Sequence, residues 1–586
     1  MVNSGTISTT FGAGIAISIV SSFGRDAPGG GVVNTGNIAA KSQGIIVDRV
    51  TTFFGGISNS GTIVAKTSGI DFSGNNTSFV GNIVNSNVVS ASARGLGLGF
   101  APSGNKVSGA SATPIGTASA TTIINGVQDV GVGFGGTGSA FRTTIDDFGG
   151  QVVGAQGGTG VVVSTTILGG SVQRVGFTGG GTASVTRIIN GQQFVGDNLP
   201  GGIGTAISTT IGSSGYQEVV NGNAVSTTIS AGGMQVVDVG GAAFGVQIFG
   251  GTQFDSGLVS GTRILSGGSQ VVEIGASASD TTVSKGGVLI VSSGSLAGQT
   301  AIQSGGLTRI NGGTIGAGAL VETLVSGIAV VSGTVQNSGG TLLASGTGGF
   351  IEILDGGVVS GGAVEIGNGL VNVLSGGTAD VFFTPTGSGE LRIADAAGSA
   401  TVYTGAVSGF GGGSHSNQQQ FIDLFNVHFA SGAITLSYTS SGVSNDSGTL
   451  SVSSGGQEVA EINFVGSYTS ANFQIGSGPG GTLKITDPQV VNGGIVLNGA
   501  AQSFPRNGLD LPNIAFGAQT TLAYAANGAG TGGILTVSDG RHAASIALLG
   551  NYMAGSFVTA ADGHGGTLVK ETSQVGQQPL LTHPHA

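Results

Sequence analysis

The chain contains no cysteine and no tryptophan, and only 8% of its 586 residues are charged. The absence of cysteine excludes a disulfide framework and thiolate metal sites. With a net charge of −11 and only 17 basic residues, the chain lacks the clustered Lys and Arg that nucleic acids attract. No uninterrupted apolar run reaches the length of a membrane-spanning helix, about 18 residues, so we expect no membrane span.

Glycine is abundant, with 118 residues, but it does not follow the every-third-residue period of collagen. Low charge combined with a mean hydropathy of +0.34 argues against disorder. The chain is also too long for one ordinary globular core. No window shows a sustained helical period, so we expect an ordered, all-β protein built from more than one part.

A Thr-Thr-Ile phrase returns along the middle third of the chain, and this repeat predicts the fold. Its third residue recurs at steps between 16 and 23 residues. A nearly fixed period in this range is typical of a solenoid. The recurring third residues are Ile123, Ile145, Ile167, Ile188, Ile211, Ile229, Ile248, Ile264, Val283 and Ile302.

A glycine turn and a second β-type segment with a glutamine follow each Thr-Thr-Ile phrase. Examples of this glutamine are Gln128, Gln151, Gln235 and Gln270. Because side chains alternate across a strand, we expect the aliphatic residues to stack inside and Thr, Ser and Gln to face outward. One unit cannot bury its apolar face alone, whereas roughly 12 to 17 stacked rungs can. The sequence therefore predicts a parallel β-helix, or β-solenoid.

The chain divides by pattern into five predicted parts. Residues 1–118 contain irregular Asn-x-Gly-x-Ile units, which predict irregular solenoid rungs, and 119–385 contain the regular strand-loop-strand repeat. Two β-rich modules, 386–488 and 489–570, continue or cap the solenoid, and 571–586 is a polar tail that we expect to be disordered.

The two C-terminal modules are duplicates of each other, because matching phrases recur at an offset of 84 to 87 residues. Leu436-Ser437-Tyr438 matches Leu522-Ala523-Tyr524, and Phe473 matches Phe557. Order and spacing are both kept, which indicates a true internal repeat.

The Thr-Thr-Ile and Gly-Gly-x-Gln-x-Val alternation resembles the strand-loop-strand repeat of AIDA-type autotransporter passengers, a group of bacterial adhesins. The resemblance covers about 119–345. The duplicated modules resemble those at the ends of large repeat proteins of rhizobia and related alphaproteobacteria. We expect no translocator barrel of the autotransporter kind in this chain, because its sequence shows neither aromatic girdles nor many alternating strands of about ten residues.

This resemblance implies a right-handed parallel β-helix at the cell surface, associated with the outer membrane or secreted, that acts in adhesion or autoaggregation. Its implied partners are glycans or proteins on host or neighbouring cells, or a second copy of the chain. It also implies a glycosyltransferase that adds O-linked heptose. The alternative explanation of the acceptor positions is that Thr favours strands and Ser favours turns. The candidate acceptors are Thr122, Thr144, Thr166, Thr210, Thr228, Ser266, Ser304 and Ser375.

Residues for catalysis or metal binding do not form a convincing constellation. Asp146-Asp147 is the adjacent acidic pair, but in a strand its members would point to opposite faces. The six histidines lack the spacing of a zinc site, and His583 and His585 are best explained as part of the polar tail. We therefore expect no enzymatic activity, no cofactor and no metal. A β-helix polysaccharide-active enzyme and a purely structural spacer remain the alternatives.

The first residues, Asn3-Ser4-Gly5-Thr6-Ile7, match Asn59-Ser60-Gly61-Thr62-Ile63. The chain therefore begins inside a repeat and shows no signal peptide. We interpret this as a truncated or misassigned start, or as export without an N-terminal signal.

Overall fold

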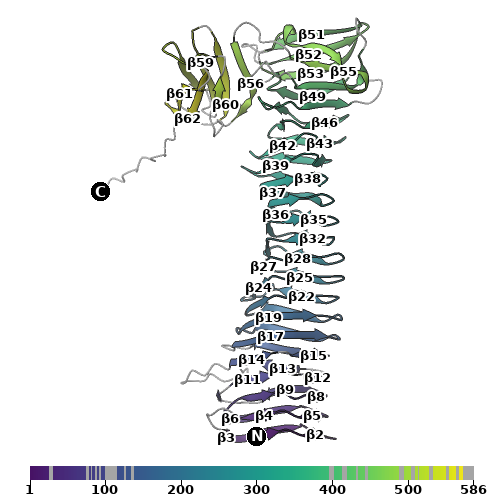
Figure 1. Ribbon diagram of the computed structural model, residues 1–586, viewed down its shortest axis with the longest axis vertical. Helices are drawn as coiled ribbons and strands as arrows, with labels where there is room; N and C mark the ends of the chain where they lie inside the picture. Colours follow the sequence, from purple (N-terminus) through teal and green to yellow (C-terminus); the bar gives the residue numbers. More distant parts are fainter. Residues whose placement is uncertain are drawn as a thin grey trace, which may run out of the picture. The chain divides into compact units, whose positions relative to one another are not determined.

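The architecture is a parallel β-solenoid of about 15 turns (Figure 1), in which most strands pair with the strand two or three places further along the chain. This computed structural model describes residues 1–24, 31–73, 78–80, 82–85, 87, 89–91, 94–98, 115–119, 121–124, 127–132, 137–394, 401–411, 419–429, 433–441, 447–466, 468–487, 494–502, 509–511, 514–526, 532–540, 542–549, 554–562 and 566–571. The predicted fold class is confirmed, and helix is limited to three short 3-10 turns in the described part.

The chain forms two compact units. Unit 1 comprises Met1–Ala301 and Gly305–Arg309, and unit 2 comprises Ile302–Ser304 and Ile310–Ala586. Strand β38 (Leu307–Ile315) contributes to both. The five sequence-based domain boundaries stay predictions.

Unit 1 begins with rungs built from the Asn-x-Gly-x-Ile units. Asn34 and Asn59 are buried and joined by a hydrogen bond from Asn34 Nδ2 to Asn59 Oδ1 of 2.5 Å. The side-chain amide of Asn3 donates to Asn34 Oδ1 at 2.6 Å, so the asparagines form a ladder. The strands of these rungs are β1 (Val2–Asn3), β2 (Thr6–Ser8), β3 (Ile15–Phe23), β4 (Val32–Asn34), β5 (Asn37–Ala40), β6 (Ile45–Phe54), β7 (Ile57–Asn59), β8 (Ile63–Ala65), β9 (Ser68–Ser73), β10 (Ser78–Val80), β11 (Asn82–Asn85), β12 (Val89–Ala91) and β13 (Arg94–Leu98).

The regular repeat of unit 1 forms three parallel sheets. The Thr-Thr-Ile phrase and the glutamine phrase each supply one of them. The first sheet holds the Thr-Thr-Ile phrase in β15 (Thr122–Ile124), β17 (Thr137–Asp146), β19 (Thr159–Ile167), β22 (Arg187–Ile188), β25 (Thr210–Ile211), β28 (Thr228–Ile229), β31 (Gln247–Ile248), β34 (Arg263–Ile264) and β36 (Ser277–Val283). The second holds the glutamine phrase in β16 (Val127–Val132), β18 (Gly150–Ala155), β20 (Val172–Phe177), β23 (Gln192–Val195), β26 (Tyr216–Val219), β29 (Met234–Val237), β32 (Thr252–Asp255) and β35 (Ser269–Val272). The start of β37 (Val288–Ile302) pairs with β35, and Leu289 takes the place of the glutamine there.

The third sheet carries a column of small and aliphatic residues into the interior. Ala183, Ala206, Ala224 and Ala243 follow one another in register and are fully buried. Its strands are β14 (Ile115–Ser119), the first halves of β17 and β19, β21 (Gly180–Ser184), β24 (Ile203–Ile207), β27 (Asn223–Val225), β30 (Ala242–Phe244), β33 (Leu258–Ser260) and the start of β36.

The core of unit 1 is the column that the repeat predicted. Ile145 pairs with Ile167, and the same register continues from turn to turn as far as Val283. The nine third residues from Ile123 to Val283 lie in unit 1 and are 0% exposed, and Ile302, in unit 2, is 0% exposed as well. Stacking of these aliphatic side chains thus excludes water along the column of unit 1.

The corner that precedes the Thr-Thr-Ile phrase has a left-handed backbone. Val185, Ser208 and Ser226 occupy it with φ values of 56°, 55° and 57°, and Gly245 and Gly261 occupy it in later turns. Glycine is therefore not required at this corner, although it adopts that conformation most easily. The corner is held by hydrogen bonds between turns, such as Ser208 N–H to the Val225 carbonyl oxygen at 2.8 Å.

Unit 2 contains parallel rungs of its own, followed by the duplicated modules. Its rung strands are β39 (Leu320–Thr323), β40 (Ile328–Val331), β41 (Thr334–Asn337), β42 (Thr341–Ala344), β43 (Phe350–Ile353), β44 (Val358–Ser360), β45 (Val364–Ile366), β46 (Leu370–Leu374), β47 (Val381–Phe383) and β48 (Glu390–Ala394). Ala329, Ile351, Val371, Leu391 and Ile422 follow one another in register inside these rungs, and each is 0% exposed.

The duplication seen in the sequence is confirmed as a repeated strand topology. The first copy has β49 (Thr401–Ser408), β50 (Phe421–His428), β51 (Ile434–Ser441), β52 (Ser447–Ser454), β53 (Gln457–Val465), η1 (Ser470–Asn472), β54 (Gln474–Ser477), η2 (Pro479–Gly481) and β55 (Thr482–Thr486). The second has β56 (Gly494–Gln502), β57 (Leu509–Leu511), β58 (Thr521–Ala526), β59 (Gly532–Ser538), β60 (Ala543–Leu549), η3 (Ala554–Ser556), β61 (Phe557–Ala561) and β62 (Thr567–Glu571). In each copy three consecutive strands pair antiparallel, β51 to β53 in the first copy and β58 to β60 in the second. The first strand of the copy, β49 or β56, runs parallel to the last of these three. The second strand, β50 or β57, pairs antiparallel with the final strand of the copy, β55 or β62.

Candidate functional site

The two threonines of each Thr-Thr-Ile phrase lie on opposite sides of the solenoid wall. Thr143 is 1% exposed and Ile145 is 0% exposed, whereas Thr144 between them is partly exposed. The same alternation holds at the other copies. The second threonine of the phrase is therefore the one whose hydroxyl can be reached from solvent.

These outward threonines form a column, because neighbouring turns are in register. Thr122 pairs with Thr144, Thr144 with Thr166, and Thr210 with Thr228. Adjacent rungs of a sheet are about 4.8 Å apart, so the column presents hydroxyl groups at nearly that interval. Figure 1 shows β22, β25 and β28, which carry part of this column, stacked one above another.

Two arginines and a glutamine interrupt the column. Arg187 lies between Thr166 and Thr210 in register, and Gln247 and Arg263 follow Thr228. All three are exposed. The sequence analysis did not single these three residues out. Their position directly before a third residue of the repeat is the signal that would have assigned them to the outward column.

The glutamines of the second sheet are buried, so the expectation that they face outward is wrong. Gln128, Gln151, Gln173, Gln193, Gln217, Gln235, Gln253 and Gln270 are all 0% exposed. Up to Gln253, each Nε2 donates to the Oε1 of the glutamine one turn earlier, at 2.5–3.0 Å. We call this column the glutamine ladder. It is inward because the buried amides satisfy one another, which removes the usual cost of burying a polar group.

The first threonine of the phrase supports the glutamine ladder. Thr209 Oγ1 lies 3.4 Å from Gln193 Oε1 and 3.3 Å from Gln217 Nε2, and Thr227 makes the equivalent pair of contacts to Gln217 and Gln235. In these two turns a buried hydroxyl therefore bridges consecutive amides, whereas Thr143 Oγ1 and Thr165 Oγ1 are buried without a hydrogen-bond partner. Only the second threonine remains for contact with other molecules.

The candidate serine acceptors lie on turns. Ser266 and Ser304 are exposed at the first position of a Ser-Gly turn, and Ser375 is partly exposed on an equivalent turn. Together with Thr122, Thr144, Thr166, Thr210 and Thr228, they stay predictions as O-glycosylation sites. Their accessibility meets the steric requirement for modification and does not by itself favour a sugar.

Unit 2 contains a cluster of charged side chains that the sequence analysis did not predict. Arg392 Nη2 lies 2.8 Å from Glu390 Oε1, and Arg392 Nε lies 3.3 Å from Asp423 Oδ2. Lys484 is the cross-strand partner of Asp423, and its Nζ lies 4.3 Å from the Phe421 ring centroid. Burial raises the pKa of Glu390, and the neighbouring Arg392 partly offsets this rise. Carboxylates and basic groups thus meet on neighbouring strands.

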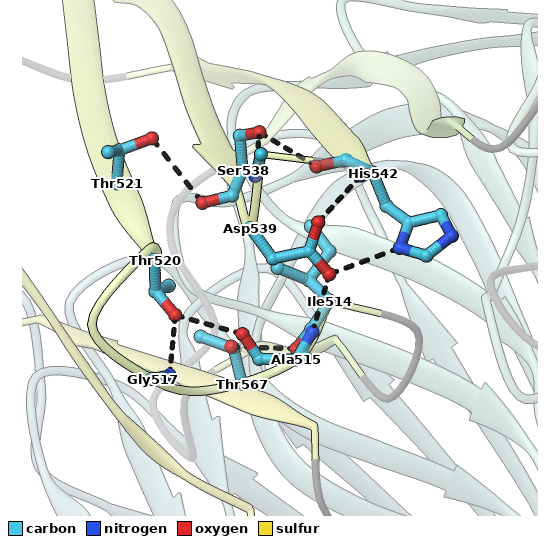
Figure 2. Close-up of polar contacts among 10 residues, drawn as sticks. Ile514, Ala515, Gly517, Thr520, Thr521, Ser538, Asp539, His542 and Thr567 are labelled. Atoms are coloured by element: carbon cyan, nitrogen blue, oxygen red, sulfur yellow. Dashed lines mark hydrogen bonds and ion pairs between the residues drawn. The ribbon is translucent and has the colours of Figure 1, made fainter.

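Residues of the second module form a further polar group around a loop (Figure 2). His542 Nδ1 lies 3.1 Å from Asp539 Oδ2, and the same oxygen accepts the Ala515 N–H at 2.9 Å. Ser538 Oγ donates to the His542 carbonyl oxygen at 2.8 Å, so this hydroxyl is held by the backbone rather than aimed at the imidazole. The group therefore closes a loop and does not form a nucleophile–base–acid arrangement.

The acidic pair that the sequence singled out is not in one strand. Asp146 ends β17, while Asp147 has a φ of 51° in the following turn, and its N–H donates to Asp146 Oδ1 at 2.8 Å. Within the described residues there is no set of three or more His, Cys, Asp or Glu side chains able to hold a metal ion. His583 and His585 lie outside the described residues, as does most of the predicted disordered tail.

No helix in the part of the chain that the structure describes is both long and apolar enough to cross a membrane.

Comparison with known proteins gives one structural match of interest. No protein-family model matches the chain, and a search of curated proteins finds no match either. Among solved structures, the chain is similar to a TibA fragment whose hyper-glycosylation is described as catalysed by TibC. The sequence identity is 28% and the TM-score is 0.39. The match covers 54% of this chain and 98% of that one.

Proposed function

We propose that this protein is a surface-exposed or secreted β-solenoid that acts in adhesion and autoaggregation by multivalent contact. The observation that supports it best is the outward threonine column, in which the turn-to-turn register repeats one chemical group at a short interval. Weak contacts presented in such a series add through avidity, so no single deep pocket is needed. The solenoid itself is then a scaffold and not an enzyme.

We further propose that hydroxyl groups of this surface carry O-linked sugars added by a glycosyltransferase. The similar TibA fragment is described as hyper-glycosylated in a reaction catalysed by TibC, which supports a glycosylated surface here. Intact-mass measurement and peptide mapping of 119–345, on protein from the native host, test this part. Mass increments in multiples of a heptose on the Thr-Thr-Ile or Ser-Gly-Gly peptides are expected, and an unmodified chain would remove the glycosylated form of the proposal.

Adhesion itself is tested with beads that carry the purified full-length chain. Replacing Thr122, Thr144, Thr166, Thr210 and Thr228 together by Val keeps β-branched strand residues while deleting the hydroxyl column. We expect bead aggregation, or attachment to a cell layer, to fall at least about tenfold because the contacts act together.

The matched control for the bead assay is Thr334→Val with Thr347→Val, two exposed threonines outside the column. This control is expected to aggregate and attach like the unaltered chain. Equal aggregation by the column variant and by the unaltered chain would refute the proposed role of the column and favour the structural-spacer alternative.

The charged cluster favours a second candidate, a polysaccharide-active enzyme. Glu390 and Asp423 flank Arg392. Two carboxyl groups can act as general acid and general base in the cleavage of a glycosidic bond. The test is release of reducing ends from a soluble neutral glucan and from an acidic uronan, with Glu390→Gln as the inactive comparison. Turnover that this substitution abolishes would establish the enzyme, whereas no turnover on either polymer leaves the cluster as a structural ion-pair network.

A further inference from the structure

The glutamine ladder ends beside a buried carboxyl group. Asp255 is the last residue of β32, and in register it follows Val237 and precedes Val272. It therefore occupies one place in a column of buried valines. Its side chain is 0% exposed.

Asp255 diverts the last amide of the glutamine ladder. In the preceding turns each Nε2 donates to the glutamine one turn earlier, but Gln270 Nε2 donates to Asp255 Oδ2 at 2.8 Å. Gln253 Oε1 therefore receives no hydrogen bond, and Asp255 Oδ1 has no donor either, although both are buried. Gln270 Oε1 is also buried without a donor, because Leu289 takes the place of a glutamine in the next turn. The break in the glutamine ladder is thus rich in acceptor oxygens and poor in donors.

The charged groups around this break are acidic. Glu273 directly follows Val272 on the neighbouring strand β35, and Asp238 directly follows Val237 on β29. Within the described residues no ion pair links Asp255 to a Lys, Arg or His. An ionised carboxylate at this place would be buried, unpaired and close to other negative charges, which is strongly unfavourable.

We propose that the folded chain holds Asp255 as the neutral carboxylic acid, so that one proton is bound at the break in the glutamine ladder and supplies the donor that the break lacks. Burial raises the pKa of Asp255 to about 8, the hydrogen bond from Gln270 opposes this rise, and the Glu273 carboxylate adds to it. The stability of these turns then depends on pH through a single buried group.

The direction in which stability changes with pH follows from the linkage between protonation of Asp255 and folding. The model value for an aspartate is 3.8, so below about pH 4 the folded and unfolded chains are both protonated and the contribution of Asp255 to stability is fully present. Between about pH 4 and pH 8 the unfolded chain releases the proton while the folded chain keeps it, and the opening constant rises about tenfold for each pH unit. Above about pH 8 both forms are ionised and this dependence ends.

The experiment measures local opening of the turns around Asp255 in the full-length chain. Amide hydrogen exchange of peptides from 234–272, corrected for the intrinsic pH dependence of exchange, is followed from pH 5 to pH 8. The variants are Asp255→Asn, which keeps a donor without a titrating proton, and Asp255→Val, which completes the valine column and frees Gln270 to bond to Gln253. Asp280→Asn, at an exposed corner with a φ of 53°, is the matched control.

We expect the opening constant of the unaltered chain, relative to Asp255→Asn, to rise about a thousandfold between pH 5 and pH 8. The Asp280→Asn control is expected to keep the pH dependence of the unaltered chain, and Asp255→Val to lose it. Equal pH dependence of the unaltered chain and Asp255→Asn would overturn the proposal.

If neither Asp255 variant folds, infrared spectra of the unaltered folded chain decide the question. A band of a protonated carboxyl group that persists at pH 6–7, and that keeps its intensity when Asp238→Asn, Glu365→Gln and Glu390→Gln remove the other carboxyls of raised pKa, supports the proposal, because ordinary aspartates are ionised there. Absence of such a band overturns it.

Discussion

The turns of unit 1 that hold the glutamine ladder and the rungs of unit 2 share one architecture but fill it differently. In unit 1 the column from Gln128 to Gln270 carries amides, while in unit 2 the column from Ala329 to Ile422 carries only aliphatic side chains. Both columns are fully buried and in register. Burial in a solenoid therefore selects for stacking of like with like, and a polar residue is acceptable when each copy satisfies its neighbour.

The two columns differ in what they specify. Successive ladder glutamines are separated by 18 to 24 residues, yet every one returns to the same place. An aliphatic column tolerates a shifted side chain of similar size, whereas a shifted amide loses its donor and its acceptor in a dry interior. The glutamine ladder thus fixes the register in the part of unit 1 where the turn lengths vary.

A glutamine placed alone in the aliphatic column should cause the largest loss. For Ile351→Gln in unit 2 we expect a destabilisation of about 3–5 kcal/mol, because the amide has no partner and the aliphatic packing is lost. Hydrogen exchange of peptides covering 328–373 measures the opening of these rungs. Ile351→Leu is the control and should cost less than about 1.5 kcal/mol. A tolerated Gln would mean that the interior of unit 2 admits water or finds another polar partner.

Removing one amide from the middle of the glutamine ladder should have the next largest effect. Gln217→Leu leaves Gln193 Oε1 without its main donor and Gln235 Nε2 with only the longer contact to Thr227. We expect a destabilisation of about 2–4 kcal/mol in exchange measurements over 192–237. Gln192→Leu, at an exposed position of the same sheet, is the matched control and should change little. Equal effects of the two substitutions would contradict a stabilising role for the ladder.

Replacing two adjacent ladder residues sharpens the comparison further. Gln217→Leu and Gln235→Leu each break the hydrogen bond between them, so the double variant breaks it only once. The double variant should therefore be about 1 kcal/mol more stable than the sum of the single losses predicts. A double-mutant cycle evaluated from the same exchange data gives this coupling, and simple additivity would show that the amides act independently.

The corners offer the smallest expected effect, and it is a stabilisation. Among the described residues of unit 2 only Ser326 combines a positive φ with a side chain, while unit 1 has many such corners, including Val185. A β-branched residue is strained there, so Val185→Gly should stabilise unit 1 by about 1 kcal/mol. Thermal unfolding measures it, with Val225→Gly in a strand of the same sheet as the control that should destabilise. A destabilising Val185→Gly would show that the exposed valine contributes packing that outweighs the strain.

Much of the fold could be predicted from the sequence because the same residue types recur at a nearly fixed spacing. The Ile column needed only the period, and the duplication needed only the matching phrases around Tyr438 and Tyr524. The inward glutamines were missed because polar residues were assigned to the outside by default. The sequence nevertheless contained the signal for which face of the strand the glutamine occupies. Gln235 lies two residues before the buried Val237, so the two side chains must share one face.

The charged cluster could not be found in the same way. Arg392, Asp423 and Lys484 are far apart in the sequence and meet only through the pairing of β48, β50 and β55. The regular repeat has ended by this point, so no period relates these residues. Asp255 escaped notice for a different reason, because one carboxyl in place of a valine leaves the period intact.

The glutamine ladder also has a direction. Every amide from Gln151 to Gln253 donates toward the N-terminal side, which leaves Gln128 Nε2 without an acceptor at one end and Gln253 Oε1 without a donor at the other. Aligned amide dipoles add, much as peptide dipoles do along a helix, so the column is positive at Gln128 and negative at Gln253. Asp255 stands at the negative end, where this field opposes its ionisation. A stack of neutral side chains thus gives the interior of unit 1 an electrostatic polarity that its composition does not suggest.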